Sequence, residues 1–106
     1  MATLEDFQKV DLRVATVISA EAHPNADRLL VLRVDLGSEQ RQIVAGIRSS
    51  YDPAALVGRQ VILVANLDSA KLRGIESQGM LLAARDGERV IVLTTDAPVP
   101  SGSKVS

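Results

Sequence analysis

The sequence contains no cysteine and a single histidine, His23. Without cysteine the chain can form neither a disulfide framework nor a thiolate zinc site, and one histidine cannot assemble the usual multi-histidine metal site. The sequence also lacks a phosphate-cradling glycine loop and any thiol or second histidine that could serve a nucleophile. We therefore expect no catalytic site, no metal and no cofactor.

Aromatic residues and long apolar runs are equally scarce. Phe7 and Tyr51 are the only aromatic side chains, which argues against the row of stacked rings on which proteins bind single-stranded nucleic acid. No run approaches the ~18 consecutive apolar residues of a membrane span. Glu5 and Asp6 lie where a secretory signal peptide would be basic. We therefore expect a cytoplasmic protein.

The length of 106 residues fits one domain, residues 1–106, because domain sizes peak near ~100 to 150 residues. The net charge of −1 is unevenly distributed within it. Residues 1–27 carry five acids and two bases, whereas residues 28–85 carry eight bases and five acids, a local charge of +3. This cationic section is either an ordinary solvated surface or the contact for a shaped anionic partner, since a protein that coats any polyanion would be far more basic.

Alternation of apolar and polar residues predicts mostly strands. The longest alternating segment is residues 10–22, whose apolar phase comprises Val10, Leu12, Val14, Thr16, Ile18, Ala20 and Ala22. Five further segments have the length and apolar content of strands, at residues 30–36, 42–45, 61–65, 80–84 and 90–93. Between the third and fourth strands, "SSYDPAALVG" has a capping Asp52, a proline suited to a first helical turn and a stopping Gly58, so it predicts a short helix.

Three strands, a short helix and two strands follow the order of an all-β, five-stranded Greek-key barrel of the OB-fold type. Residues 90–93 would then be an added C-terminal strand segment. A small β-sandwich has a similar number of strands and stays open as an alternative. At the N-terminus, "TLEDF" predicts a capped helical turn with Thr3 as the cap and Asp6 complementing the helix end, placed to plug one end of the barrel.

The segment between the fourth and fifth strands, residues 66–79, interrupts two apolar strands with cations and glycines. In an OB-fold this loop lies beside the nucleic-acid-binding face. Lys71 and Arg73 can reach phosphates from a backbone turned at Gly74. Ser77 offers a hydrogen bond, and Gly79 allows close backbone approach just before the flexible apolar Met80. The segment therefore predicts either an RNA contact strip or an ordinary solvated hairpin.

The run "KLRGIESQGM", preceded by Asn66 at the end of an apolar strand, resembles the motif of the structure-specific tRNA-binding domain family. This family includes the C-terminal domain of many methionyl-tRNA synthetases, free-standing tRNA-binding proteins, a cofactor of aminoacyl-tRNA synthetases and a small bacterial export-related chaperone. The blocks "DFQKVDLRVATVISAEAHPNADRLLVLRVDLG", "QIVAGI", "YDPAALVGRQVILVANL" and "PVPSGSKV" extend the resemblance over nearly the entire chain. It is strongest to the synthetase domain.

The resemblance implies a dimeric barrel that binds tRNA by shape, around the corner of the L, with little dependence on sequence. The matching positions here, which are the predicted tRNA-binding residues, are Asn66, Lys71, Gly74, Ser77 and Met80, with Arg73 as a neighbouring cation. Many relatives have proline where this chain has Ser69, so we expect a less preorganised loop and weaker binding. Shape and phosphate contacts suit a folded RNA.

Two further groups of residues lie outside this motif. Arg28, Arg33, Arg41 and Arg48 are candidate secondary RNA contacts along one barrel face, with independent solvated cations as the alternative. Residues 23–27, "HPNAD", predict a turn and cap that joins the first two strands, because proline and Asx residues close turns. His23 could also touch RNA from that loop.

The favoured function is a non-catalytic tRNA-binding module that assists aminoacylation by methionyl-tRNA synthetase, whose catalytic body would be a further partner. An enzyme is disfavoured, since Glu76 is a lone carboxylate without a nucleophile or acid beside it. The alternative is a chaperone-like or protein-interaction module, supported by the resemblance to the export-related chaperone and by the hydrophobic content of 46%.

Residues 90–93 also motivate a prediction about assembly. A five-stranded barrel should be complete by about Arg85, yet this segment is apolar on both faces. Proteins cover or pair apolar edges, and the family resemblance implies a dimer built from the terminal segments. We expect a two-fold symmetric homodimer.

Overall fold

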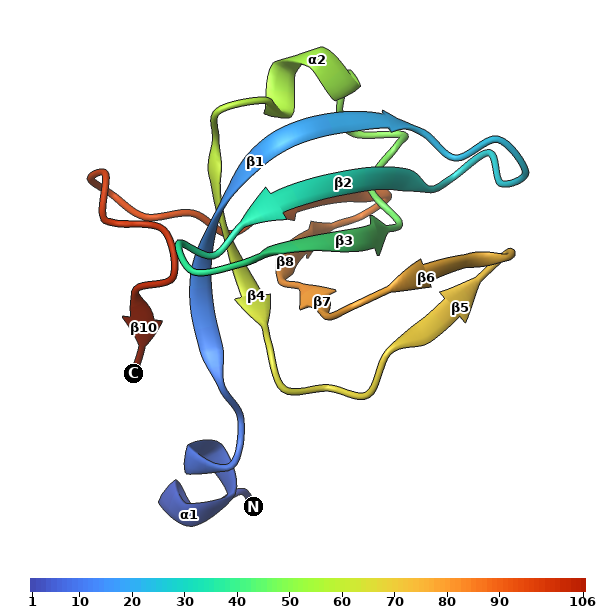
Figure 1. Ribbon diagram of the computed structural model, residues 1–106. Coiled ribbons are helices and arrows are strands. Elements are labelled where there is room, and N and C mark those ends of the chain that lie inside the picture. Colours follow the sequence, from blue (N-terminus) through green and yellow to red (C-terminus); the bar gives the residue numbers. More distant parts are fainter.

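The computed structural model describes residues 1–106 and has a nearly closed β-barrel at its centre (Figure 1). The barrel sheet has the order β3-β2-β1-β4-β7, and β3 and β7 at its two ends lie against each other. Its strands are β1 (Leu12–Ala22), β2 (Leu30–Asp35), β3 (Gln40–Ala45), β4 (Gln60–Val64), β7 (Met80–Leu81) and, paired with β1, β10 (Lys104–Val105). The predicted all-β OB-fold is confirmed.

Two small antiparallel sheets accompany the barrel. One is a hairpin of β5 (Ala70–Leu72) and β6 (Ile75–Ser77), and the other joins β8 (Ala83–Asp86) to β9 (Arg89–Val92). The two helices, α1 (Leu4–Gln8) and α2 (Pro53–Leu56), have five and four residues, and neither has the length and apolar content to cross a membrane.

The first strand is long and curved as predicted, but its alternation changes phase. Leu12 and Val14 are buried on the outer side of the barrel, whereas Ala15 and Val17 belong to the core inside it. The register with β2 shifts between Val17 and Ser19, and Ile18 is 41% exposed. Because such a bulge adds one residue to one strand, the predicted single phase from Val10 to Ala22 was wrong.

The short helix α2 lies between β3 and β4 and covers one end of the barrel (Figure 1). Asp52 caps it, accepting a hydrogen bond from the Ala54 amide at 3.2 Å, and Pro53 occupies its first turn. Leu56 is fully buried in the core. The prediction of this helix is confirmed.

The N-terminal helix α1 has the predicted capping box. The Asp6 amide donates to Thr3 Oγ1 at 3.2 Å, and the Thr3 amide donates to Asp6 Oδ2 at 3.0 Å. However, none of its residues is buried, and it projects from the barrel (Figure 1). The prediction that it plugs a barrel end was wrong, because no barrel side chain covers its apolar residues Leu4 and Phe7, which are 71% and 45% exposed.

The predicted strand at residues 80–84 is broken at Leu82. The amide of Leu82 donates to the Ile62 carbonyl at 2.9 Å, while its carbonyl accepts from the Leu93 amide at 3.1 Å. The chain therefore leaves the barrel at this residue and continues into the β8–β9 hairpin. Val90 and Val92 of that hairpin pack against the barrel core, so the chain itself partly covers the segment expected to need a partner.

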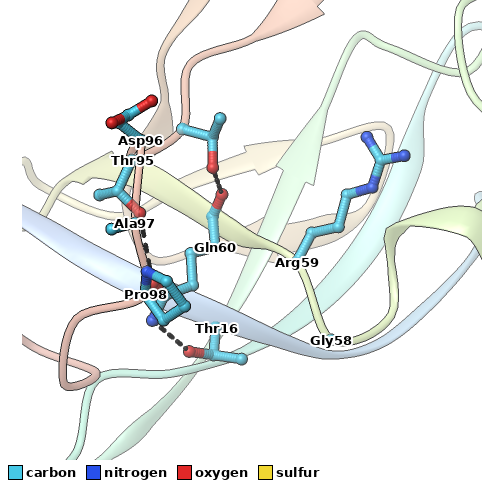
Figure 2. Close-up of a pocket in the computed structure, with 9 residues that line it drawn as sticks. Thr16, Gly58, Arg59, Gln60, Thr95, Asp96, Ala97 and Pro98 are labelled. Atoms are coloured by element: carbon cyan, nitrogen blue, oxygen red, sulfur yellow. Dashed lines mark hydrogen bonds between the residues drawn. The ribbon is translucent and has the colours of Figure 1, made fainter.

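After β9 the C-terminal tail, residues 93–103, returns across the outer side of β1 and β4. The side-chain amide of Gln60 holds this tail. Its Oε1 accepts from the backbone amide of Val99 at 3.1 Å, and its Nε2 donates to the Val99 carbonyl at 2.7 Å. Figure 2 shows the hydrogen bonds of Gln60 with Thr16, Thr94 and Thr95. These residues line an open hollow of about 510 Å³. The tail is thus part of the fold.

Candidate functional site

The segment between β4 and β7 forms a hairpin, β5–β6, that turns at Arg73 and Gly74. Both residues have positive φ, 53° and 91°, as in the two-residue type I′ turn that matches the twist of antiparallel strands. Glycine adopts this conformation freely, but a residue with a Cβ atom loses about 1–2 kcal/mol there. An arginine kept at such a position is a candidate for a functional role.

The tip of the hairpin is attached to the loop between β1 and β2. Arg73 Nη2 donates to the Asn25 carbonyl at 3.2 Å. His23 is only 2% exposed, and its Nε2 lies 3.0 Å from the carbonyl oxygen of Leu72. Because His23 Nδ1 accepts from the Asn25 amide at 3.0 Å, Nε2 carries the proton and donates to Leu72.

The β1–β2 loop therefore connects two strands and also contacts the hairpin. The predicted turn at residues 23–27 is present, and the His23 ring joins it to the hairpin. Sequence reasoning missed that link, because nothing in "HPNAD" specifies a partner 49 residues away. In Figure 1 the loop and the hairpin extend to the same side of the barrel, while the two termini lie elsewhere.

The second strand of the hairpin and the residue that follows it are attached to β3. The Gln78 amide donates to the Gln42 carbonyl at 2.8 Å, and Gln78 Oε1 accepts from the Gln42 amide at 2.9 Å. Gln42 Nε2 also donates to the Glu76 carbonyl at 2.7 Å. The hairpin is therefore held at its tip and along one edge, despite the serine that stands in place of a proline at position 69.

Ser77 supports this attachment from inside. It is 4% exposed, and its hydroxyl accepts from the Val44 amide at 2.9 Å and donates to the Gly79 carbonyl at 3.0 Å. Its hydroxyl thus already makes two hydrogen bonds within the chain, and its contact with RNA stays a prediction. Gly79 fits here because a Cβ atom would lie 2.9 Å from the Val64 carbonyl oxygen. Met80, immediately after it, is 50% exposed.

Asn66 is also occupied within the fold. Its Oδ1 accepts from the Asp11 amide at 2.8 Å, and its Nδ2 donates to the Lys9 carbonyl at 2.7 Å. These bonds tie the end of β4 to the segment that precedes β1. Asn66 therefore fixes the start of the loop, and because the residue is exposed, its contact with RNA stays a prediction.

Lys71 is the freest of the predicted contact residues. It lies opposite Glu76 in the hairpin register, is exposed, and makes no ion pair or side-chain hydrogen bond. Together with Arg73 it places two cations on a hairpin only a few residues long. A polyanion that approaches this side of the barrel would meet both.

The four secondary arginines do not form one row. Arg33 lies opposite Gln42 and Arg41 opposite the core residue Val34, so they face opposite sides of the sheet. Arg41 donates to the carbonyls of Ala65 and Gln78 and pairs with Glu39. The prediction of a shared face was wrong, because adjacent residues on a strand alternate in direction. Two of the four, Arg28 and Arg48, are exposed near the loop between β1 and β2.

The electrostatic perturbations lie away from the hairpin. Arg13 Nε donates to Asp11 Oδ1 at 2.8 Å, and this hydrogen bond lowers the pKa of Asp11 below its usual value. The same contact raises the pKa of Arg13. No group of His, Asp or Glu side chains is arranged to hold a metal ion.

Comparisons with known proteins agree on one family. A family model for the tRNA-binding domain matches residues 12–104. The methionine–tRNA ligase of Thermotoga maritima is 57% identical over 104 residues, which make up 98% of this chain but only 16% of that enzyme. Among solved structures, a MetRS-related protein from Pyrococcus horikoshii superimposes with a TM-score of 0.93 at 36% identity, covering 100% of this chain and 98% of that one. The chaperone CsaA of Bacillus anthracis has a TM-score of 0.92 at 32% identity, covering 100% and 99%.

Proposed function

Because the chain belongs to the tRNA-binding domain family, we propose that residues 1–106 are one non-catalytic module that binds tRNA by its shape and phosphates. In this proposal it assists aminoacylation in the cytoplasm as part or partner of a methionyl-tRNA synthetase. The chain spans about one sixth of the length of the ligases it matches. The catalytic body would therefore lie on another part of the protein or on another subunit.

The observation that carries the proposal is the fixed cationic hairpin. Lys71 and Arg73 extend from a two-residue turn that is hydrogen-bonded to both the β1–β2 loop and β3. Phosphate contacts from such groups supply affinity without reading sequence. Because the backbone under the cations is held before binding, little additional order is required when RNA binds.

Salt dependence tests this function directly. Three to five phosphate contacts should give a slope of about −2 to −4 in log affinity against log salt, at roughly 0.7 per contact. Folded tRNA should bind more tightly than the same tRNA denatured in the absence of magnesium. The proposal fails if the protein binds no tRNA, or if affinity does not change with salt.

A second copy of the chain is the other partner that we propose. Leu4 and Phe7 on α1 are exposed, and the tail ends in β10 at the edge of β1. A symmetric pair would cover these residues and double the cationic surface that meets one RNA.

A chaperone-like role is the second candidate, favoured by the similarity to CsaA. Capture of tRNA compared with an unfolded polypeptide separates the two roles. Preferential binding of the polypeptide, with no tRNA bound at low salt, would support the chaperone.

A further inference from the structure

Two hollows meet on the barrel beside Met80. The first is a slot of about 230 Å³ between the end of β3 and the strands β7 and β8, and most of the residues that line it are hydrophobic, among them Val44, Ile47 and Ala83. The second is a polar hollow of about 510 Å³ lined by Arg28, Ser49, Arg85 and Glu88, among others. Gly46, Arg85 and Val90 line both of them, so the two hollows share a wall.

The slot exists because the barrel is not closed by a ladder between its end strands. β3 and β7 occupy the two ends of the sheet order, and β8 pairs with β9 instead. Where β3 reaches Val44, its amide donates to the side-chain hydroxyl of Ser77 in β6 and not to a backbone carbonyl of a paired strand. The gap beyond that point is walled by aliphatic side chains and by exposed Met80.

The polar hollow carries unpaired positive charge. Arg28 and Arg85 are exposed, and neither guanidinium takes part in an ion pair or a side-chain hydrogen bond. Glu88 is the only acid lining the hollow. Guanidinium groups bind phosphate oxygens through two parallel hydrogen bonds, so this hollow is complementary to a phosphate.

We propose that the two hollows together hold one unstacked nucleotide of the bound RNA, with its base in the slot beside Met80 and its phosphate on Arg28 and Arg85. This inference rests on the proposed tRNA-binding function. Bases that project from folded RNA are commonly held between apolar side chains, and a small slot takes one base where a stacking platform would take several. An apolar peptide side chain would fill the slot but leave the two arginines without a partner.

The nucleotide lies within reach of the hairpin surface. Met80 begins β7 and is separated from the end of β6 by Gln78 and Gly79 only, so one wall of the slot lies close to the hairpin along the chain. Arg28 closes the β1–β2 loop whose Asn25 accepts from Arg73. Phosphates on Lys71 and Arg73 and a nucleotide in the slot would therefore belong to the same RNA contact.

Methionine methyl NMR gives a direct test, since Met1 and Met80 are the only methionines. A nucleoside 5′-monophosphate should shift the Met80 methyl and the amides of Gly46 and Arg85, whereas inorganic phosphate should shift the signals of the polar hollow alone. The proposal is overturned if a saturating concentration of the nucleotide shifts the NMR signals of neither hollow. So would an apolar peptide that shifts Met80 where the nucleotide does not.

Binding of intact tRNA provides an independent measurement. Arg85→Gln should weaken binding roughly three- to tenfold and make the salt slope shallower by about 0.7–0.9. Ala83→Leu fills the slot and should weaken binding without changing the slope. Arg59→Gln, which removes an exposed cation beside the distant hollow of Figure 2, is the matched control and should bind like the parent.

Thermal unfolding identifies variants that do not fold, and Arg28→Gln then replaces the affected one. Parental binding by folded Arg85→Gln and Ala83→Leu refutes the nucleotide subsite. If Lys71→Gln weakens tRNA binding in that experiment, the proposed function stands while the subsite is rejected. If no tRNA binds to the parent, the function itself is rejected.

Discussion

Arg73 has a backbone conformation that is unfavourable for arginine. Its φ of 53° is the only positive value at a non-glycine residue in the chain. Asparagine and glycine are favoured at the first position of a type I′ turn, so selection for folding alone would not place arginine there. Its hydrogen bond to Asn25 recovers part of the loss, and the proposed phosphate contact would give an arginine a role at this position.

Arg73→Asn should separate these two effects. Asparagine tolerates the turn, so we expect the free energy of unfolding to stay equal or rise by a few tenths of a kcal/mol. Affinity for tRNA should fall, and the salt slope should become shallower by about 0.7–0.9. Lys71→Gln is the comparison, with the same change in slope from a strand position of ordinary conformation. Unchanged affinity in both variants would place the RNA surface elsewhere.

The ion pair between Asp11 and Arg13 gives a pH-dependent prediction. The pKa of Asp11 is lowered by the hydrogen bond from Arg13, so the charged form is favoured in the folded state. This contribution is present above the unfolded pKa of about 3.9 and is lost as pH falls through the lower folded value. Asp11→Asn should therefore unfold at a lower temperature than the parent at pH 7, and the difference should shrink toward about pH 3. A difference that is equal at both pH values would contradict this assignment.

At the scale of the element, the β5–β6 hairpin depends on the β1–β2 loop for its position. His23 is a positioning residue, because it contacts the hairpin backbone and is too buried to touch RNA. It uses one ring nitrogen to shape its own loop and the other to hold Leu72.

Two substitutions of His23 separate its contact with its own loop from its contact with Leu72. His23→Gln can place an amide nitrogen near the Nε2 position and keep the bond to Leu72, whereas His23→Asn can keep the acceptor for the Asn25 amide but is too short to reach Leu72. We expect the asparagine variant to bind tRNA roughly two- to tenfold more weakly, the equivalent of one lost hydrogen bond, with an unchanged salt slope. The glutamine variant should bind nearly like the parent.

Hydrogen exchange provides the readout that distinguishes positioning from general destabilisation. Amides of the hairpin should exchange faster in His23→Asn while those of β1 and β2 stay protected. Equal tRNA affinity in the two variants, or uniform loss of protection across the barrel, would show that His23 does not position the hairpin.

Elements that depend on local signals were predictable, and contacts between distant segments were not. Alternation and the Asp52-Pro53 pair specify the strands and α2, since these signals act over a few residues. The bulge at Ile18 and the break at Leu82 depend on partner strands. In the same way, the sequence identified Lys71 as a cation able to reach a phosphate but could not show that Ser77 and Asn66 make hydrogen bonds inside the fold.

At the scale of the molecule, the termini and the hairpin lie in different regions (Figure 1). The sequence-based prediction of a dimer rests on residues 90–93 and on the family resemblance, and the structure places Val90 and Val92 against the core. Removal of everything after Arg85 would therefore damage the barrel and would not test assembly. The dimer contact that we propose is instead on α1, where Leu4 and Phe7 are exposed.

Replacement of Leu4 and Phe7 by glutamate should convert a dimer to a monomer. Neither side chain is buried within one chain, so the barrel should unfold at nearly the parental temperature. Burial of each side chain in a dimer contributes up to about 1.5–3 kcal/mol to association. A carboxylate at the same position would oppose association instead. Val57→Glu, at a site that is 52% exposed at the end of α2, is the matched control and should stay dimeric.

Light scattering at micromolar concentration measures the outcome. The parent and the Val57 variant should have twice the mass of one 11.3 kDa chain, and the double variant should have the mass of a single chain. The monomer should also bind tRNA more weakly, because two linked cationic surfaces on one RNA raise the effective concentration of the second contact. A parent with the mass of one chain would refute the dimer. It would leave each hairpin, with Lys71 and Arg73, to bind tRNA alone.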